Sequence, residues 1–248
     1  MNGSTKKSVL TPIVLTVLGL GIAAIWYLRP QITAYLLISK LKHDNPELSF
    51  VPKSIAIKEI DQAPGTSVSA FGYTFEVPWG EVEQTENLKL GSRIKFKSGQ
   101  VILFMDPSNE LTDLAMLKQS AEARGLSVTA LYGPDASHSY QLLKAIYETT
   151  PERSSLLQSR NQAIRDMVFL TMKSAYMDRS GTDTFVVETE RWRGFQHHLP
   201  PTDRFVILKL FSRNDQQVTV WVGSKDKTVS VTQPQINRIV QTLRPLGS

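Results

Sequence analysis

The feature that most constrains this chain is a run of 21 residues without a charged side chain near its start. The run reads SVLTPIVLTVLGLGIAAIWYL, from Ser8 to Leu28. At about 1.5 Å per helical residue it would span about 30 Å, the thickness of the hydrocarbon core of a bilayer. Arg29 follows the run, and Trp26 and Tyr27 stand where aromatic rings settle at a membrane–water boundary. The run therefore predicts a transmembrane helix over residues 8–28.

A cleaved signal peptide is the alternative interpretation of the same run. Gly21, Ile22 and Ala23 offer small residues at the spacing that a signal peptidase requires after a basic start. The apolar run continues beyond this site and is longer than the usual hydrophobic region of about 7 to 15 residues in a signal peptide. The length favours an anchor that stays attached.

The basic residues around the run bear on orientation. Lys6 and Lys7 precede it, and Arg29, Lys40 and Lys42 follow it, so the counts are nearly even. A short basic tail before a first apolar segment is typical of a signal-anchor. We therefore expect a single-pass protein of the cell membrane, in contact with the lipid bilayer, whose folded domain lies on the extracytoplasmic side. A cytoplasmic domain that faces lipid head groups through Lys40 and Lys42 is the alternative.

The remaining composition describes a chain that can fold around a core. Hydrophobic residues make up 41% of the 248 residues. The net charge of +5 arises before Asp44, because from that residue onward 23 basic residues balance 23 acidic ones. Proteins that bind nucleic acid usually concentrate positive charge on their folded part, so we expect no nucleic-acid partner.

Two X-Pro pairs, at residues 45–46 and 51–52, favour extended or turn conformations and separate a stalk from the domain. The predicted organisation is a basic tail over 1–7, a transmembrane helix over 8–28, a juxtamembrane stalk over 29–53 and a folded domain over 54–248.

Hydrophobic periodicity divides the domain into strands, then helices, then strands again. Alternation and short apolar runs predict early strands within 67–107, and helical spacing predicts helices over 111–125, 139–150 and 151–177. Late strands are predicted over 183–190, 192–198, 203–212 and 216–224, with an amphipathic helix over 235–246. Short connections between the late strands indicate antiparallel neighbours.

Three stretches resemble the PsbP-like fold group, which is named for an extrinsic photosystem II subunit. They are GYTFEVPWG at 72–80, the block at 193–224 and QINRIVQTLRP at 235–245. An aromatic strand that runs into Pro-Trp, a late antiparallel meander and a closing helix recur in that group. The resemblance implies an α+β fold in which the transmembrane helix precedes an α/β/α sandwich on a mainly antiparallel sheet. Members mostly bind or assemble, so the resemblance implies no catalytic residue.

The neighbouring histidines His197 and His198 are the first candidates for chemistry. Adjacent residues on a strand point to opposite faces, so the pair is a poor chelate. A site built from one of them with His138 and Asp203 lacks any recognised ligand spacing. We interpret the pair as the polar end of a strand and predict no metal and no cofactor.

Other catalytic patterns are absent from the sequence. It contains no cysteine, no G-x-S-x-G and no phosphate-binding glycine loop in the folded part, which excludes thiol chemistry and argues against serine hydrolases. Paired carboxylates occur at Glu81 with Glu83 and at Glu188 with Glu190. Such pairs are typical of the solvated face of an antiparallel strand, although acid–base chemistry is the functional alternative.

Aromatic residues remain as candidates for recognition. Trp192 stands between two arginines, where cation–π contact or ligand stacking would be favourable, and core packing is the alternative for it and for Trp79. We select Trp192, Arg193, His197 and His198 as candidate partner-binding residues. The sequence thus predicts a membrane-anchored, non-catalytic binding or assembly protein with a protein partner. The alternative is a membrane-tethered hydrolase or metal-dependent enzyme that uses His197 or His198 with a nearby carboxylate.

Overall fold

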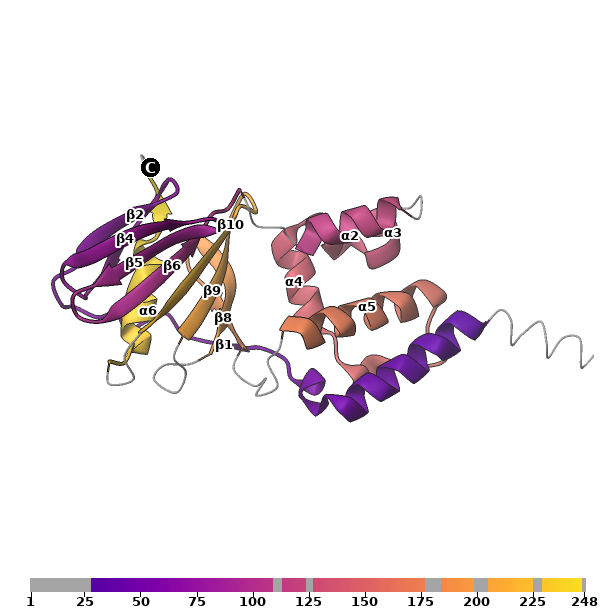
Figure 1. Cartoon of the computed structure of the whole chain (residues 1–248). Coiled ribbons are helices and arrows are strands. Elements are labelled where there is room, and N and C mark those ends of the chain that lie inside the picture. The colour runs from indigo at the N-terminus through magenta and orange to yellow at the C-terminus, as the bar shows by residue number, and fades with distance from the viewer. Residues whose placement is uncertain are drawn as a thin grey trace, which may run out of the picture.

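The structure, a computed structural model, shows two lobes, one built on strands and the other on helices (Figure 1). The helical lobe is formed mainly by the chain between two strands of the other lobe, so the chain leaves the sheet and returns to it. The residues that the structure describes are 28–108, 113–123, 127–176, 184–198, 205–224 and 229–246.

The strand lobe contains two sheets. Its strands are β1 (Lys53–Ser54), β2 (Thr66–Ala70), β3 (Tyr73–Val77), β4 (Val82–Leu88), β5 (Gly91–Phe96), β6 (Gln100–Met105), β7 (Thr184–Glu188), β8 (Trp192–His197), β9 (Phe205–Ser212), β10 (Gln217–Ser224) and β11 (Arg244–Pro245). The large sheet has the order β1-β7-β8-β9-β10-β6-β5-β4, and the small sheet has the order β11-β3-β2. Among the strands that the structure describes, β1 and β7 form the one parallel pair of the large sheet, so this sheet is mixed.

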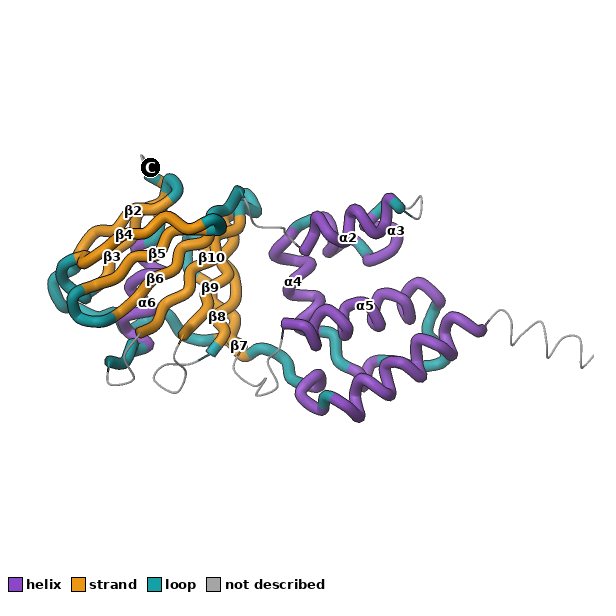
Figure 2. The backbone as a smooth tube through the Cα atoms, in the orientation of Figure 1, coloured by secondary structure: helices purple, strands orange, loops and turns teal. Residues whose placement is uncertain are grey.

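The core of the strand lobe lies between one face of the large sheet and a layer formed by the small sheet and helix α6 (Gln233–Thr242) (Figure 2). Ile236, Ile239 and Val240 supply the helical side of this core at the i, i+3, i+4 spacing of an amphipathic helix. Phe104 of β6 reaches across to the small sheet, where its ring stacks on Tyr73 and Phe75 at centroid distances of 5.9 Å. These contacts join the two sheets into one body.

The helical lobe follows β6 and ends before β7. It contains α2 (Asp113–Glu122), α3 (Val128–Tyr132), η2 (Pro134–Ser137), α4 (Ser139–Glu148), η3 (Pro151–Arg153) and α5 (Arg160–Tyr176). Its helices bury a cluster of their own that includes Leu117, Tyr132, Leu142, Ile146 and Phe169. This cluster contains no residue of either sheet, so the lobe has a separate core.

Helix α4 connects the two lobes. Tyr140 and Tyr147 on one face of α4 pack against Phe195 of β8 and Phe211 of β9. The carboxylate of Asp215, in the β9–β10 turn, accepts hydrogen bonds from the backbone N–H groups of the first two residues of α4, at 2.5 and 3.1 Å. A carboxylate at a helix N-terminus also interacts favourably with the helix dipole. The sheet therefore supplies the cap that α4 lacks in its own sequence.

The segment before the sheet packs on the helical lobe. Residues 28–44 are helical, and the following turn is η1 (Pro46–Ser49). Ile38 and Leu48 are buried against Leu170 of α5. The sequence predicts a stalk over residues 29–53, whereas Ile38, Leu41 and Leu48 of this segment pack on the helical lobe.

Lys173 of α5 is fully buried and holds this segment in place. Its Nζ donates hydrogen bonds to the carbonyl oxygens of Leu48, Phe50 and Thr149 at 2.9, 2.5 and 2.9 Å. Burial lowers the pKa of Lys173 to about 8, and the charge of Glu152 opposes this shift. The side chain therefore stays mostly protonated at neutral pH, and its three N–H donors match the three acceptors.

The predicted membrane architecture requires correction. The segment 8–28, for which the sequence predicts a transmembrane helix, lies outside the described residues except for Leu28. Among the helices that the structure describes, none is both long enough and apolar enough to cross a bilayer. Residues 28–44 illustrate why: this helix includes Arg29, Lys40 and Lys42 and buries one face on α5. The single-pass membrane location, the lipid contact and the extracytoplasmic placement therefore receive no support from the structure and are not retained.

The predicted α/β/α sandwich is also wrong. The structure is α+β, but α6 and a second sheet cover one face of the large sheet, and the helices between β6 and β7 pack mainly on one another. The helix predicted over 151–177 begins only at Arg160, because the segment before it forms η3 and turns. Ser159 accepts a hydrogen bond from the N–H of Gln162 through its hydroxyl and so caps α5.

Candidate functional site

The candidate residues on β8 alternate between the two faces of the large sheet, as strand geometry requires. Trp192 and Gln196 face the side of α6, since they bond to Leu243 and Gln233. Arg193 and His197 face the opposite side, which α4 covers. The strand therefore divides the predicted recognition residues between two intramolecular interfaces.

Trp192 is part of the core. Its side chain is 3% exposed, and its indole Nε1 donates a hydrogen bond to the carbonyl oxygen of Leu243 at 2.8 Å. The ring lies 6.2 Å from that of Tyr73. Trp192 thus ties β8 to the junction between α6 and β11 and presents little surface to a partner. Trp79 is likewise buried, with its ring edge-on to Phe96.

Arg193 and His197 both contact α4. The guanidinium carbon of Arg193 lies 4.4 Å from the centre of the Tyr140 ring, a cation–π geometry. Nε2 of His197 lies 3.2 Å from the hydroxyl of Tyr147, and Nδ1 lies 3.2 Å from the hydroxyl of Thr184. Both side chains therefore contact the chain's own helix α4. Their role in binding another protein stays a prediction.

Burial lowers the pKa of His197 to about 4, with smaller contributions from the charges of Lys209 and His198. His197 is therefore neutral at physiological pH. His198 has a φ of 70°, so the extended conformation of β8 ends between the two histidines. The prediction that the pair forms the polar end of a strand agrees with this geometry for His198, while His197 lies under α4.

The metal hypothesis gains no geometric support. His138 is exposed at the start of α4, and Asp203 lies outside the described residues. Across the ranges that the structure describes, no group of three histidine, aspartate or glutamate side chains is placed to hold a metal ion.

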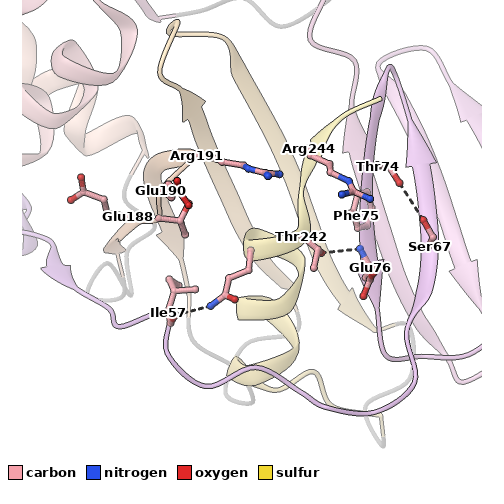
Figure 3. A pocket seen from close by; sticks show the side chains of 12 residues that line it. Ile57, Ser67, Thr74, Phe75, Glu76, Glu188, Glu190, Arg191, Thr242 and Arg244 are labelled. Atoms are coloured by element: carbon pink, nitrogen blue, oxygen red, sulfur yellow. Dashed lines mark hydrogen bonds between the residues drawn. The ribbon is translucent and has the colours of Figure 1, made fainter. Parts of the chain in front are cut away.

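The two carboxylate pairs have different surroundings. Glu81 forms an ion pair with Lys97 of the neighbouring strand region, and Glu83 is exposed on β4. Glu188 and Glu190 line a surface cleft instead (Figure 3). This cleft, of about 540 Å³, is the candidate functional site, and we call it the charged cleft.

Two walls enclose the charged cleft. One wall is the β7–β8 turn, and the other is formed by the small sheet with the C-terminal end of α6. Its lining residues are Ile57, Ser67, Thr74, Phe75, Glu76, Glu188, Thr189, Glu190, Arg191, Gln241, Thr242 and Arg244. The walls therefore come from three separate parts of the chain, of which β2 and β3 lie more than a hundred residues before the β7–β8 turn.

Hydrogen bonds fix the walls. Thr189 closes the β7–β8 turn, because its N–H donates to the carbonyl oxygen of Trp192 at 2.7 Å and its hydroxyl accepts from the Trp192 N–H at 3.0 Å. On the other wall the hydroxyl of Thr242 accepts from the N–H of Glu76 at 2.9 Å. Gln241 donates to the carbonyl oxygen of Ile57 at 2.8 Å (Figure 3). The Trp192 to Leu243 bond then holds one wall against the other.

Four of the charged side chains that line the cleft are exposed to solvent. Glu188 ends β7, Glu190 and Arg191 belong to the β7–β8 turn, and Arg244 belongs to β11. Figure 3 shows Arg191 reaching from the turn toward the end of α6, with the two glutamates behind it and Arg244 on the far wall. Within the described part of the chain none of these four forms an ion pair, whereas Glu76 pairs with Arg238 at 3.0 Å.

Only part of this site can be recognised from the sequence. The pattern of Glu188 and Glu190 predicts a solvated strand face, and nothing in the sequence singles out Arg244, Gln241 or Thr242. No local signal identifies these residues, because β11 has two residues and its pairing with β3 depends on a distant strand. The sequence feature that could have indicated this site is the high density of charged residues at 188–193.

Comparisons with known proteins add no relative: no protein-family model matches the chain, and searches of curated proteins and of solved structures find no match. The resemblance to the PsbP-like fold group therefore stays a prediction that rests on the three stretches quoted above.

Proposed function

We propose that this chain is a non-catalytic binding or assembly protein, and that the charged cleft receives a polar segment of a partner protein that carries charges of both signs. The observation that carries the proposal is the set of four exposed charges on two fixed walls, without ion pairs among the residues described. Charges held apart in this way are available to a ligand, and they favour complementary partners over others.

The size and lining of the cleft support a peptide segment over a small apolar ligand. A volume of about 540 Å³ accommodates a few amino-acid residues. Small-molecule sites are mostly apolar and enclosed, but Ile57 and Phe75 are the apolar side chains of this lining and the others are polar or charged. An extended segment could present a carboxylate to Arg191 or Arg244 and an amine to Glu188 or Glu190.

The geometry of the histidines favours binding over a reaction. His197 would be the general base of the enzyme hypothesis, but it does not line the charged cleft and is held by Tyr147 and Thr184 beneath α4. A general base must reach the proton that it removes, within hydrogen-bond distance or through one water. The cleft itself offers carboxylates and guanidinium groups, which recognise charge.

The test is site-specific photo-crosslinking of the full chain in its native cells, with the photoreactive residue at the exposed position Ser67 in the cleft. We expect a discrete crosslinked partner whose yield falls at least about tenfold in the double variant Arg191→Glu, Arg244→Glu, and falls further as salt is raised. Lys118→Glu, on the exposed surface of α2, is the matched charge-reversal control and should leave the yield unchanged. An identical crosslinking pattern in the double variant and the wild type would refute the proposal.

A further inference from the structure

The helix of residues 28–44 has two apolar stripes, and only one of them is covered. Ala34 and Ile38 are each 2% exposed and face α5 and η1. Leu28, Ile32 and Leu36 recur every four residues and are 40%, 36% and 62% exposed. Residues spaced by four share a face of a helix, so these three form a second stripe beside the buried one.

The exposed stripe borders a groove in the helical lobe. The groove lies between the helix of residues 28–44 and the turn before α5, and its volume is about 470 Å³. Leu28, Ile32, Leu156 and Leu157 provide its apolar lining, and Leu157 is 96% exposed. Clustered exposed apolar side chains of this kind mark interaction surfaces, because water contact with them is unfavourable.

Charge decides what kind of partner fits this groove. Arg160 is the charged residue of the lining, and within the part of the chain described here it forms no ion pair. A second copy of the chain would bring a further Arg160 to the interface, and like charges disfavour that arrangement. A carboxylate beside an apolar stripe is the complementary arrangement.

We propose that this groove docks an amphipathic helix of another protein, with its apolar side chains against Leu28, Ile32 and Leu157 and a carboxylate against Arg160. The exposed stripe from Leu28 to Leu36 is about 12 Å long, which matches two turns of a partner helix with anchors at i, i+3, i+4 and i+7. Side chains that project from a partner helix can enter a concave groove, whereas a flat membrane surface would leave the groove unfilled. The proposal is independent of the charged cleft.

The experiment uses the full chain and two fluorescein-labelled peptides of about 18 residues, long enough to form helix. Both carry leucine at helical spacing. One carries glutamate beside the leucines, and the other carries lysine at the same positions. Fluorescence anisotropy should show that the glutamate peptide binds at least about tenfold more tightly than the lysine peptide, because only the former complements Arg160.

Three variants test the site. Leu157→Ser and Arg160→Glu should each weaken the glutamate peptide by about tenfold or more, with Arg160→Glu improving the lysine peptide. Both residues lie at the surface, so the thermal unfolding midpoint should stay near that of the wild type. Leu37→Ser is the control, because Leu37 is 44% exposed on the opposite side of the same helix and does not line the groove.

Three outcomes would overturn the proposal. The first is equal affinity for the two peptides, and the second is an unchanged affinity in Leu157→Ser. The third is a different occupant. If vesicles of phosphatidylglycerol and phosphatidylcholine bind the chain and Leu157→Ser abolishes that binding, the surface faces lipid. If sedimentation shows a dimer that Leu157→Ser dissociates, the occupant is a second copy.

Discussion

The strand lobe and the helical lobe are stabilised in different ways. Among the residues described, the strand lobe buries one continuous cluster of 21 apolar side chains that joins both sheets to α6. The helical lobe buries two smaller clusters, of eight and three residues. Its connections to the rest of the chain include a buried lysine and a helix cap supplied by another element. We infer that the helical lobe unfolds more easily and depends more on polar contacts.

The difference follows from how each lobe is built. Strands that are paired on both sides present continuous apolar faces, so the strand lobe buries one large shared core. Short helices are marginal without tertiary packing, so the helical lobe relies on the few contacts that orient its helices. Local opening is therefore expected to begin in the helical lobe.

Phe104→Ala is expected to have the largest effect. Phe104 is fully buried, and its ring contacts Tyr73 and Phe75 of the other sheet, so truncation should cost about 4 kcal/mol of unfolding free energy. Urea denaturation measures this loss, with tryptophan fluorescence reporting mainly on the strand lobe, which contains Trp79, Trp192 and Trp221. We expect the circular dichroism signal of the helices to be lost at the same lower urea concentration.

Phe169→Ala provides the matched change in the helical lobe. Phe169 is also buried, and its ring stacks on Tyr132 at 6.0 Å. We expect its truncation to move the helical signal to lower urea while the tryptophan signal moves little. If both signals move together in this variant, the two lobes unfold as one unit and the comparison between them fails.

Lys173→Met should be the most damaging change to a polar contact, at about 3 kcal/mol. The methionine fills the space but donates no hydrogen bond, so the carbonyl oxygens of Leu48, Phe50 and Thr149 lose the donor that they share. Amide hydrogen exchange should show faster exchange in residues 28–50 and α5, with β8 to β10 unchanged.

Lys144→Met is the control for that variant. Lys144 lies at the surface of α4 and forms an i, i+4 ion pair with Glu148 at 3.8 Å. Exposed pairs of this kind contribute below about 0.5 kcal/mol. Equal effects of the two lysine substitutions would show that burial of Lys173 is not what makes it important.

His197 should make the contact between the lobes sensitive to acid. Its pKa is lowered to about 4, whereas the unfolded chain binds the proton near pH 6.5. Between these values the unfolded state holds more protons than the folded state, so stability falls as pH falls from about 6.5 to about 4 and levels off below. The loss should be about 3 kcal/mol, measured by urea denaturation at a series of pH values.

His197→Gln should flatten the pH dependence in that window. The carboxylates that titrate at lower pH, such as Glu152 with its pKa lowered to about 2 mainly by the hydrogen bond from Ser49, are present in both proteins and cancel in the difference. A wild type and variant with parallel pH profiles would mean that His197 does not report on the contact between α4 and β8.

The strand lobe could largely be predicted from sequence, and particular residues explain why. Strands β7 to β10 and helix α6 lie where the alternation and helical spacing placed them, because those patterns are local. How the two sheets, α6 and the helical lobe pack on one another could not be predicted in this way, because that packing depends on contacts between distant residues. The cap of α4 comes from Asp215, 76 residues beyond Ser139, and no local pattern announces such a partner.

The candidate site was less predictable than the fold. Trp192 and Arg193 were selected because a tryptophan between arginines suggests recognition, yet the structure buries Trp192 and stacks Arg193 on Tyr140. Arg244 reaches the charged cleft only because α6 returns the chain to β3. Similarly, nothing around Lys173 in the sequence distinguishes it from an exposed helical lysine. Its burial depends on the segment before the sheet, to which it donates hydrogen bonds.

Glu81→Gln should have the smallest effect and so sharpens the comparison of polar contacts. Glu81 and Lys97 form an ion pair at the edge of the large sheet, and their side chains are 74% and 66% exposed. Water screens this pair, and ordering two long side chains offsets its attraction, so its loss should cost less than about 0.5 kcal/mol. Thermal unfolding of wild type and variant in low and high salt measures the effect. A destabilisation as large as that of Lys173→Met would mean that an exposed polar contact can stabilise the strand lobe as strongly as a buried one stabilises the helical lobe.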